Sequence, residues 1–478
     1  MGAANGDFRL QAGSPCIDTG SNDYADWEFD FDGNPRIRNG TVDMGAYEYQ
    51  GEPQTPDPDP YLSDPEDAED AAPLLITTAY DGFLYDTNNT VRGTVTLKAT
   101  AKVKADKKTG IATTNWTVSA KAVMQAASVS FSGKPVGVLE HFDVTTKNGE
   151  RLDVFMQGDR FFGTVSGGKV GGTFTVDGAR AVFADKKDEG AKKRLDEFRG
   201  VYNVALMETD NHPSLPRGYV SLTVGNLGSV KYAGLLSDGT KVSGSGKLLD
   251  GLSEETDNHP SLLAVALFRP LYSKKGFIGG LLWIDADTQQ VLVDTDYDWL
   301  VDWVYADPQK VPFAYALDVL GGYFGNGTTA VPAPSGLSFS AFVETDDYPS
   351  LPNIIGGRWI EEAFPLGLLA TPSGLKLSID KGAAPKKPKG EDAYDYEAVR
   401  DRNPALATLS YTAKTGVFKG KFNLYYDGLN AKGALQHKAV SVPYAGLMIP
   451  HEGALIGLGT GTATVNKRKH GIPVFLGN

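Results

Sequence analysis

Residues 91–103 carry the clearest hydrophobic pattern in this chain. Valine, leucine, alanine and one glycine occupy the odd positions, while arginine, threonine and lysine occupy the even positions. A period of two sends alternate side chains to opposite faces of a β-strand, so this run predicts a half-buried strand of an antiparallel sheet. Shorter runs between turn residues predict further strands at 114–120, 128–132, 153–156, 163–165 and 172–176.

The all-β pattern has one predicted interruption and one strong turn signal. Asp177 would cap a helix over residues 179–198, whose apolar side chains are placed to face a core. Residues 237–240, Ser-Asp-Gly-Thr, predict a hairpin, because Asp-Gly supplies the positive φ angles of a two-residue turn. Local antiparallel pairing fits tandem barrels or sandwiches, and we favour barrels because closure leaves no exposed sheet edge.

Three near-copies of one acidic peptide recur at residues 208–215, 255–262 and 344–351. Each copy lies between strand-like runs and is therefore predicted to be a loop. Loops tolerate sequence drift better than cores do, so this repetition indicates either recent duplication or a shared surface role. Similar segments also flank the first and third copies in the same order, and two related β modules are the simplest account.

Length and composition predict how the chain is divided. Its 478 residues allow about three separate cores. Residues 51–73 contain prolines and acidic residues without a basic one, which predicts an extended spacer. The predicted parts are an N-terminal segment at 1–50, the acidic linker at 51–73, a β module with the helix at 74–200, a second β module at 201–334, and a third, related to the second, at 335–478.

The N-terminal segment carries a family resemblance. Residues 8–20, 30–36 and 42–49 resemble, in that order, the last coil and C-terminal cap of bacterial right-handed parallel β-helix proteins, a pectate-lyase-like architecture of secreted surface proteins. The later β region resembles the C-terminal regions of uncharacterised large surface proteins of the Planctomycetes, Verrucomicrobia and Lentisphaerae, which carry no known activity. The resemblance implies an extracellular or cell-surface location, with the signal peptide lying outside this chain.

Net charge, cysteine content and hydropathy argue against several classes of partner and structure. The net charge of −13 and the pI near 5.0 argue against nucleic acid as a partner, because long-range repulsion would oppose the encounter. Cys16 is the single cysteine, so neither an intrachain disulfide nor a cysteine-based zinc site can form. No apolar run approaches the roughly 18 residues of a transmembrane helix.

The repeated peptides hold the first set of candidate ligand-binding residues. Oxygen donors in them would favour Ca²⁺, whereas the imidazoles would favour Zn²⁺ or Ni²⁺. A shared binding loop without metal and a duplicated structural turn are the alternatives, since Asp-Asn followed by Pro-Ser is ordinary turn chemistry. The candidate residues are Glu208, Asp210, His212, Glu255, Asp257, His259, Glu344, Asp346 and Tyr348.

Two further candidate sites lie outside the repeats. Glu28, Asp30 and Asp32 copy the first ligand positions of a calcium loop, but Asn39 stands where the bidentate glutamate belongs, and a cap turn is the alternative. Trp299 and Trp303, interleaved with aspartates, would form a glycan-stacking platform if they were exposed, and would be core residues if they were not.

These observations favour a region without catalysis. Ser214 and Ser261 each follow a histidine by two residues, but neither lies in a Gly-x-Ser-x-Gly elbow. We expect a non-catalytic adhesive or structural region of a large bacterial surface protein that contacts glycan, matrix or neighbouring subunits. The alternatives are an accessory carbohydrate-binding region of a polysaccharide-degrading enzyme and a surface-layer or filament subunit.

Overall fold

The computed structural model divides the chain into two compact units, residues 1–73 and 74–478. The division falls at the end of the acidic linker. No helix among the described residues is long and apolar enough to cross a membrane. The structure describes residues 9–10, 14, 16–22, 25, 29–30, 32, 34–38, 40–49, 74–105, 112–136, 139–209, 216–252, 261–294, 299–341, 366–370, 373–389, 403–429, 432–465 and 468–477.

Turns held by buried carboxylates dominate the described part of the first unit. A short hairpin pairs β1 (Ile37–Arg38) with β2 (Thr41–Val42). The side chain of Asp43 accepts hydrogen bonds from the backbone N–H groups of Asp18 and Tyr49, both at 2.6 Å. Such bonds satisfy donors that strands would otherwise pair, which is how a segment with little regular structure stays compact.

The first sheet of the second unit is an eight-stranded meander whose first and last strands pair. Val95, Leu97 and Ala99 of β4 are buried and alternate with more exposed polar residues, which confirms the predicted half-buried strand. The shorter predicted strands at 114–120, 128–132, 153–156 and 163–165 also lie within observed ones, and the one predicted at 172–176 starts one residue before β10. The strands are β3 (Leu74–Tyr85), β4 (Val91–Ala105), β5 (Ala112–Met124), β6 (Ser128–Gly133), β7 (His141–Thr145), β8 (Arg151–Gln157), β9 (Arg160–Ser166) and β10 (Thr173–Arg180). We call this sheet the first barrel.

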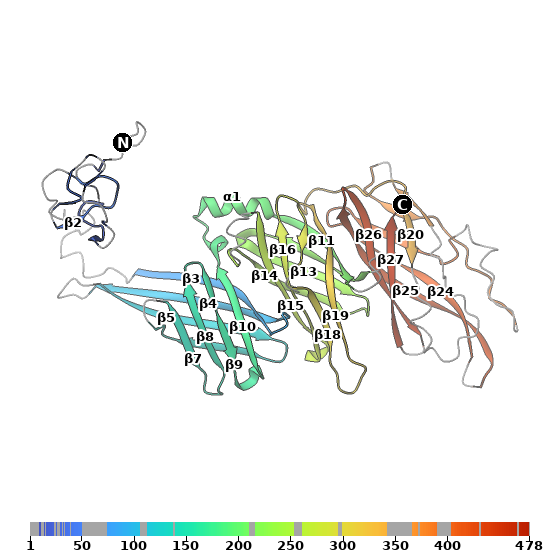
Figure 1. The fold of residues 1–478 in the computed structure, drawn as a ribbon. Helices are drawn as coiled ribbons and strands as arrows, with labels where there is room; N and C mark the ends of the chain where they lie inside the picture. The colour runs from blue at the N-terminus through green and yellow to red at the C-terminus, as the bar shows by residue number, and fades with distance from the viewer. Residues whose placement is uncertain are drawn as a thin grey trace. The chain divides into compact units, whose positions relative to one another are not determined.

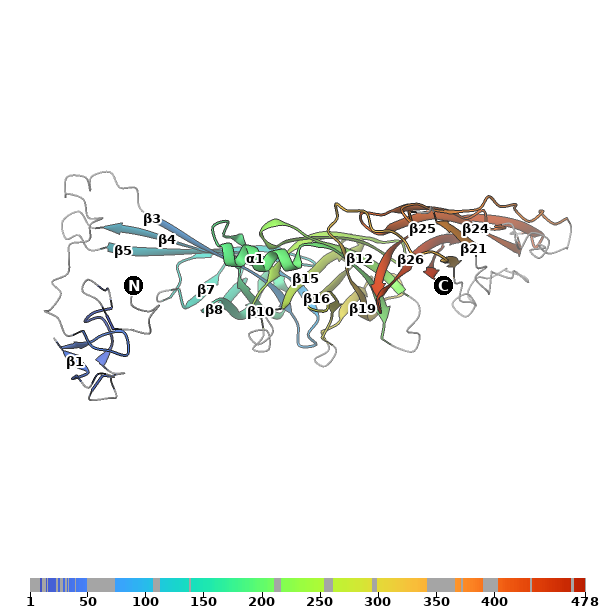
Figure 2. The ribbon, with the colours of Figure 1, turned by 90° about the horizontal axis from the view of Figure 1, so that it is seen from above.

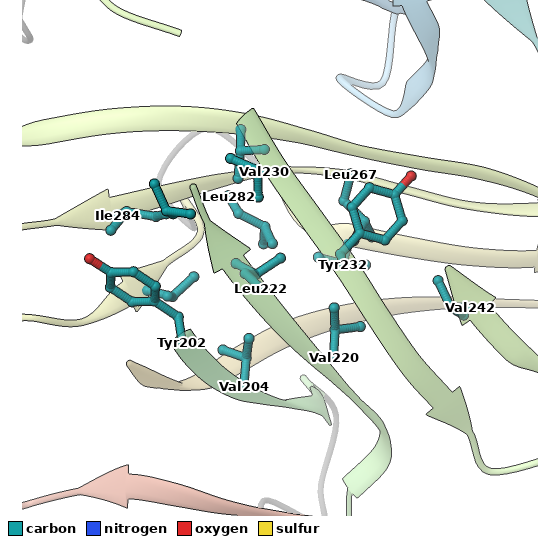
Figure 3. Packing of buried hydrophobic residues seen from close by; sticks show 14 of the residues in the cluster. Tyr202, Val204, Val220, Leu222, Val230, Tyr232, Val242, Leu267, Leu282 and Ile284 are labelled. Carbon is teal, nitrogen blue, oxygen red and sulfur yellow. The ribbon is translucent and has the colours of Figure 1, made fainter. Parts of the chain in front are cut away.

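The second barrel is a closed ring within the described residues. The ring runs from β11 through β12, β13, β14, β15, β16, β18 and β19 back to β11, and the short β17 pairs with β16 beside it. Buried apolar side chains from the strands fill the ring (Figure 3). The strands are β11 (Gly200–Glu208), β12 (Pro216–Val224), β13 (Ser229–Leu236), β14 (Lys241–Leu249), β15 (Leu262–Leu271), β16 (Gly276–Asp285), β17 (Val291–Leu292), β18 (Val301–Tyr305) and β19 (Phe313–Gly325).

The third barrel repeats the meander, again with its first and last strands paired. Phe418 and Phe422 of β24 lie in its core. The sequence therefore predicted the all-β class correctly, and the structure resolves the choice between barrels and sandwiches in favour of barrel-like sheets. The strands are β20 (Ser338–Ala341), β21 (Leu366–Ala370), β22 (Leu377–Ile379), β23 (Thr408–Thr412), β24 (Val417–Leu429), β25 (Leu435–His451), β26 (Ala454–Val465) and β27 (Arg468–Gly477).

The helix is shorter than the predicted span of 179–198. Helix α1 covers Glu189–Phe198, and its N-cap is Asp188, whose side chain accepts a hydrogen bond from the backbone N–H of Ala191 at 2.8 Å. Asp177 instead lies in β10, because residues up to Arg180 complete the ladder with β3. The buried residues of α1 pack into the core of the second barrel, so the helix contributes to that core (Figure 1).

The predicted hairpin at 237–240 forms, but its turn differs in detail. It joins β13 to β14, and the backbone N–H of Gly239 bonds to the carbonyl of Leu236 at 2.9 Å. Positive φ is confined to Gly239 at 82°, so Asp238 does not adopt the left-handed conformation that a two-residue Asp-Gly turn would require. The side chain of Asp238 instead accepts a bond from the backbone N–H of Thr240.

The second barrel packs against both of its neighbours. At its junction with the first barrel, Phe83 and Val91 join an apolar cluster with Phe268 and Phe277. A Cβ at Gly279 would stand 2.2 Å from the carbonyl oxygen of Val91, so the two backbones meet closely there. The second junction, between the second and third barrels, has its own apolar cluster, formed by Ala205, Met207, Tyr219, Leu447, Ile449 and Leu458.

Candidate functional site

The strand ends that flank the first two repeated peptides lie at opposite ends of the second barrel. Residues 208 and 216 flank the β11–β12 connection, whereas 252 and 261 flank the β14–β15 connection. Because neighbouring strands are antiparallel, connections an odd number of strands apart emerge from opposite ends of a barrel. The shared-loop hypothesis concerns residues outside the described ones and stays a prediction.

Glu208 is the one repeat candidate that the structure describes. Its carboxylate forms an ion pair with Arg217 of β12 at 2.6 Å, and the Arg217 guanidinium lies over the ring of Tyr315, 4.9 Å from its centroid. This carboxylate therefore already has a cationic partner in the barrel wall. The other candidates lie outside the described residues and stay predictions, namely Asp210, His212, Glu255, Asp257, His259, Glu344, Asp346 and Tyr348.

The prediction that Trp303 belongs to an exposed glycan-stacking platform is wrong, and its core alternative holds. Its side chain is 2% exposed in the core of the second barrel, and its Nε1 donates a hydrogen bond to the hydroxyl of Tyr272 at 2.9 Å. Trp299 is half-buried and packs edge-on against Phe83 and Tyr85 of the first barrel. Strand alternation turns Trp303 inward and the first junction covers part of Trp299, so neither residue offers an open stacking face.

The predicted calcium loop contains carboxylates that already bind other groups. Asp30 accepts hydrogen bonds from the backbone N–H groups of Asp32, Asn34 and Glu48, each at 2.9 Å. Burial raises the pKa of Asp30, but these donors outweigh burial and leave that pKa below its ordinary value. Asp32 pairs with Arg9 at 2.5 Å, and Glu28 lies outside the described residues. These contacts agree with the cap-turn alternative, and Ca²⁺ stays a prediction.

A second acidic group in the first unit has the spacing of a cation site. Ligand oxygens of Asp18, Asp43 and Glu48 lie within 4.8 Å of one another. Both oxygens of Asp43 and both oxygens of Glu48 accept backbone N–H bonds. Burial raises the pKa of Glu48. The visible role of this group is to hold turns together.

A row of stacked rings, two of them exposed and one half-buried, crosses three adjacent strands of the first barrel. We call His141 of β7, Phe155 of β8 and Phe162 of β9 the aromatic row. His141 and Phe155 are direct cross-strand partners, as are Phe155 and Phe162. Their rings stack, with centroids 4.3 Å apart for the first pair and 6.2 Å for the second. Phe155 is 47% exposed and Phe162 is 40% exposed, so the row forms an apolar strip on the surface.

Charged side chains border the aromatic row. His141 Nε2 lies 2.7 Å from a carboxylate oxygen of Asp153, and Arg151 bridges Asp153 and Asp143 at 2.8 Å. The Arg151 guanidinium lowers the pKa of Asp143. On the other side, Arg160 pairs with Asp177 at 3.0 Å. An apolar strip edged by carboxylates and guanidinium groups suits a ligand that combines apolar faces with hydroxyl groups.

The sequence contained a signal for this row that its analysis missed. Phe161 and Phe162 stand just before the strand predicted at 163–165, and extending that strand over them, as β9 does, requires one of the two neighbours to face outward. Phe161 is fully buried and Phe162 is the outward one. Phe155 likewise stands between the buried Val154 and Met156. Only the pairing register, however, aligns Phe155 with Phe162.

An apolar hollow of about 580 Å³ lies where the second and third barrels meet. It is formed by the end of β19, the connection that follows it and the β25–β26 hairpin. None of its described lining residues is acidic, basic or histidine, and Tyr323 is its one titratable side chain. The lining residues are Tyr323, Val331, Pro332, Ala333, Pro334, Pro450, Gly453, Ala454 and Leu455.

A titratable group lies at the first junction. Asp302 of β18 interacts with Thr90, Asp86 and Arg92, which all come from the β3–β4 turn region of the first barrel. Burial is the main cause that raises the pKa of Asp302 to about 6, and the charge of Asp86 adds to it, while Thr90 and Arg92 oppose it. The Arg92 guanidinium also lies 4.7 Å from the ring centroid of Phe277.

We expect Asp302→Asn to stabilise the protein at neutral pH. Because the folded-state pKa exceeds the ordinary 3.8, the stability linked to this carboxyl is fully present below about pH 4 and is lost as pH rises through 6. After allowance for partial exposure, the variant should gain about 1–2 kcal/mol at pH 7.5 and almost nothing at pH 4. Urea unfolding at both pH values measures this. Asp287→Asn, at an exposed turn, is the control, and equal gains at both pH values would contradict the prediction.

Comparison with protein-family models gives no match, and comparison with curated proteins gives none either. Among solved structures, the chain is similar to intact TbpB with its N and C lobes, at 11% identity and a TM-score of 0.21, covering 85% of this chain and 77% of that one. It is also similar to a transferrin binding protein B vaccine antigen from Haemophilus parasuis, at 9% identity and a TM-score of 0.14, covering 85% and 76%. At these scores the likeness carries no argument about function.

Proposed function

We propose that residues 74–478 are a non-catalytic, glycan-binding adhesive region of an extracellular bacterial surface protein. The observation that carries this proposal is the aromatic row, an exposed apolar strip with polar groups on both sides. Sugars present apolar C–H faces beside hydroxyl groups, and protein sites for them combine aromatic rings with hydrogen-bonding side chains. The extracellular location rests on the family resemblance of the N-terminal segment.

The two junctions support an adhesive role. Each joins barrels through a buried apolar cluster, and Asn203 adds hydrogen bonds at the second junction. Barrels joined in this way hold their surfaces in fixed relation, so a binding row on the first barrel keeps its orientation with respect to the third. An accessory region of a polysaccharide-degrading enzyme would bind glycan in the same way and would differ by a catalytic site elsewhere in the parent protein.

We expect Phe155→Ala with Phe162→Ala to weaken glycan binding at least tenfold. The double variant removes both phenylalanine rings of the row, and because they are largely exposed the stability cost should stay below about 1.5 kcal/mol for each ring. A glycan array probed with the full chain, with and without EDTA, identifies the ligand, and titration calorimetry then compares the variants.

Phe29→Ala is the matched control, since Phe29 is 53% exposed and lies outside the three barrels. It should bind as the wild type does. Unchanged affinity in the double variant would remove the aromatic row as the site. A wild-type chain that binds no glycan on the array would overturn the proposed function itself. Loss of binding in EDTA would add a metal, for which the repeated acidic peptides are the first candidates.

A further inference from the structure

A second surface of the first barrel carries lysines without acidic partners. We call Lys98, Lys102 and Lys104 of β4, Lys121 of β5 and Lys134, just after β6, the lysine face. All five are exposed. None takes part in an ion pair between described residues. In a chain of net charge −13, this is a local concentration of positive charge.

Hydroxyl groups fill the positions between these lysines. The register places Lys98 opposite Ser119, Lys121 between Thr96 and Ser130, and Lys102 opposite Asn115. Strands about 4.8 Å apart with alternate residues about 6.8 Å apart make this a regular lattice of ammonium and mostly hydroxyl groups. The exposed hydroxyl residues on β3–β6 that share it are Thr77, Thr96, Thr113, Thr117, Ser119, Ser128, Ser130 and Ser132.

Among the described residues, Asp81 borders the lysine face. Asp81 of β3 lies opposite Thr96 and is half-buried. Burial raises the pKa of Asp81, which favours its neutral form, while the charge of Lys247 opposes that shift. The described residues of β4, β5 and β6 include no aspartate or glutamate. The face therefore presents positive charge with little local compensation.

Protection of a sheet edge does not explain Lys98 and Lys121. Charged side chains often guard exposed edge strands against pairing with another chain. Lys98, however, has hydrogen-bonded neighbours on both sides, Ala79 and Ser119, and Lys121 has Thr96 and Ser130. Both lysines lie on interior strands of the sheet. Solubility does not require them either, since the chain already carries a large net negative charge.

The lysine face is also long. Strands β3, β4 and β5 extend beyond the rest of the first barrel (Figure 2). The register agrees, because β4 and β5 pair out to Ala105 and Ala112, whereas β6 stops pairing at Val118. From the level of Lys121 to Lys104 the strip spans about 27 Å at 3.4 Å per residue. A linear polymer fits such a strip better than a compact ligand does.

We propose that the lysine face binds a linear anionic polysaccharide, one that carries uronate or sulfate groups. Ammonium groups pair with the carboxylates or sulfates, and the serine and threonine rows hydrogen-bond to sugar hydroxyls. The positive charge of the lysine face favours an acidic polymer, although the net negative charge of the chain repels such polymers at long range. The hydroxyl groups of the face then favour a polysaccharide over other acidic polymers. This inference rests on the proposed glycan-binding function and adds a second site with a defined ligand class.

The test compares two triple variants of the full chain. Lys98→Ser, Lys102→Ser and Lys121→Ser remove the centre of the lysine face. Lys414→Ser, Lys419→Ser and Lys421→Ser remove three exposed lysines from the third barrel and change the net charge equally. With alginate and dextran sulfate as probes, the first triple should bind at least tenfold more weakly and show a shallower salt dependence, while the control stays within twofold. Circular dichroism and thermal unfolding verify that both variants fold.

Several outcomes would overturn the inference. Equal weakening by both triples would show that net charge, and not this face, decides binding. Affinity for polyglutamate, anionic vesicles or duplex DNA equal to that for alginate would remove the selection for a sugar. Binding to neutral dextran that matches alginate would remove the role of charge. The Phe155 and Phe162 double variant separates this inference from the proposed function, because it should keep alginate binding while it loses the array ligand of the aromatic row.

Discussion

Phe198→Ala is expected to lower the free energy of unfolding by about 3–5 kcal/mol. Phe198 ends helix α1 and is fully buried in the core of the second barrel. It packs there with Phe183 and Leu195, and its carbonyl accepts a hydrogen bond from the hydroxyl of Tyr202 at 2.9 Å. Truncation removes most of an aromatic side chain and leaves a cavity that the strands cannot collapse to fill.

Urea unfolding followed by tryptophan fluorescence measures this loss, because Trp303 reports on the same core. Lys193→Ala on the exposed side of α1 is the matched control and should change stability by less than about 0.5 kcal/mol. A loss below about 1 kcal/mol for Phe198→Ala would show that the helix is not part of the barrel core in solution.

Asn203→Ala is expected to separate the unfolding of the second and third barrels. Asn203 of β11 is 0% exposed, and its Nδ2 donates to the carbonyl oxygens of Thr415 and Met448, both at 3.0 Å. Both acceptors belong to the third barrel, so this amide bridges the second junction. Alanine removes both of these hydrogen bonds at a largely buried amide, at a cost of about 2–4 kcal/mol.

Differential scanning calorimetry tests the coupling. The wild type should unfold these barrels in one transition, and the variant should show two, with the third barrel melting separately. Ser221→Ala is the control, since the Ser221 hydroxyl donates to Asn203 Oδ1 at 2.8 Å and its loss leaves the bridge to the third barrel intact. That control should cost about 1 kcal/mol and keep a single transition. A single transition in Asn203→Ala would contradict the proposed rigid junction.

The local hydrophobic pattern predicted strands of the first barrel well, because the alternation of buried and exposed side chains is visible in a few consecutive residues. Residues 91–103 read as a half-buried strand, and β4 contains all of them. The predicted start of the helix at residue 179 was wrong for a physical reason. Nothing local to residues 179–188 shows that the segment first completes a ladder with β3, about a hundred residues earlier in the chain, before Asp188 can cap a helix.

The candidate site was harder to predict because exposure depends on neighbours that are distant in sequence. Trp303 and Phe155 both stand at alternating positions of strands beside charged residues. Trp303 faces the closed interior of the second barrel, and Phe155 faces solvent on the first. A single strand cannot reveal which of its faces the barrel will enclose.

The sequence by itself therefore determined the all-β class, the positions of six strands of the first barrel and the hairpin at 237–240, because alternation and turn chemistry act over a few residues. Only the tertiary structure decided the register that stacks Phe155 on Phe162, the amide bridge of Asn203 and the lysine face across β4, β5 and β6. Each of these joins residues from separate strands. Their proximity depends on which strands pair and on how the barrels pack. These contacts join residues far apart in the sequence, so no local periodic pattern predicts them.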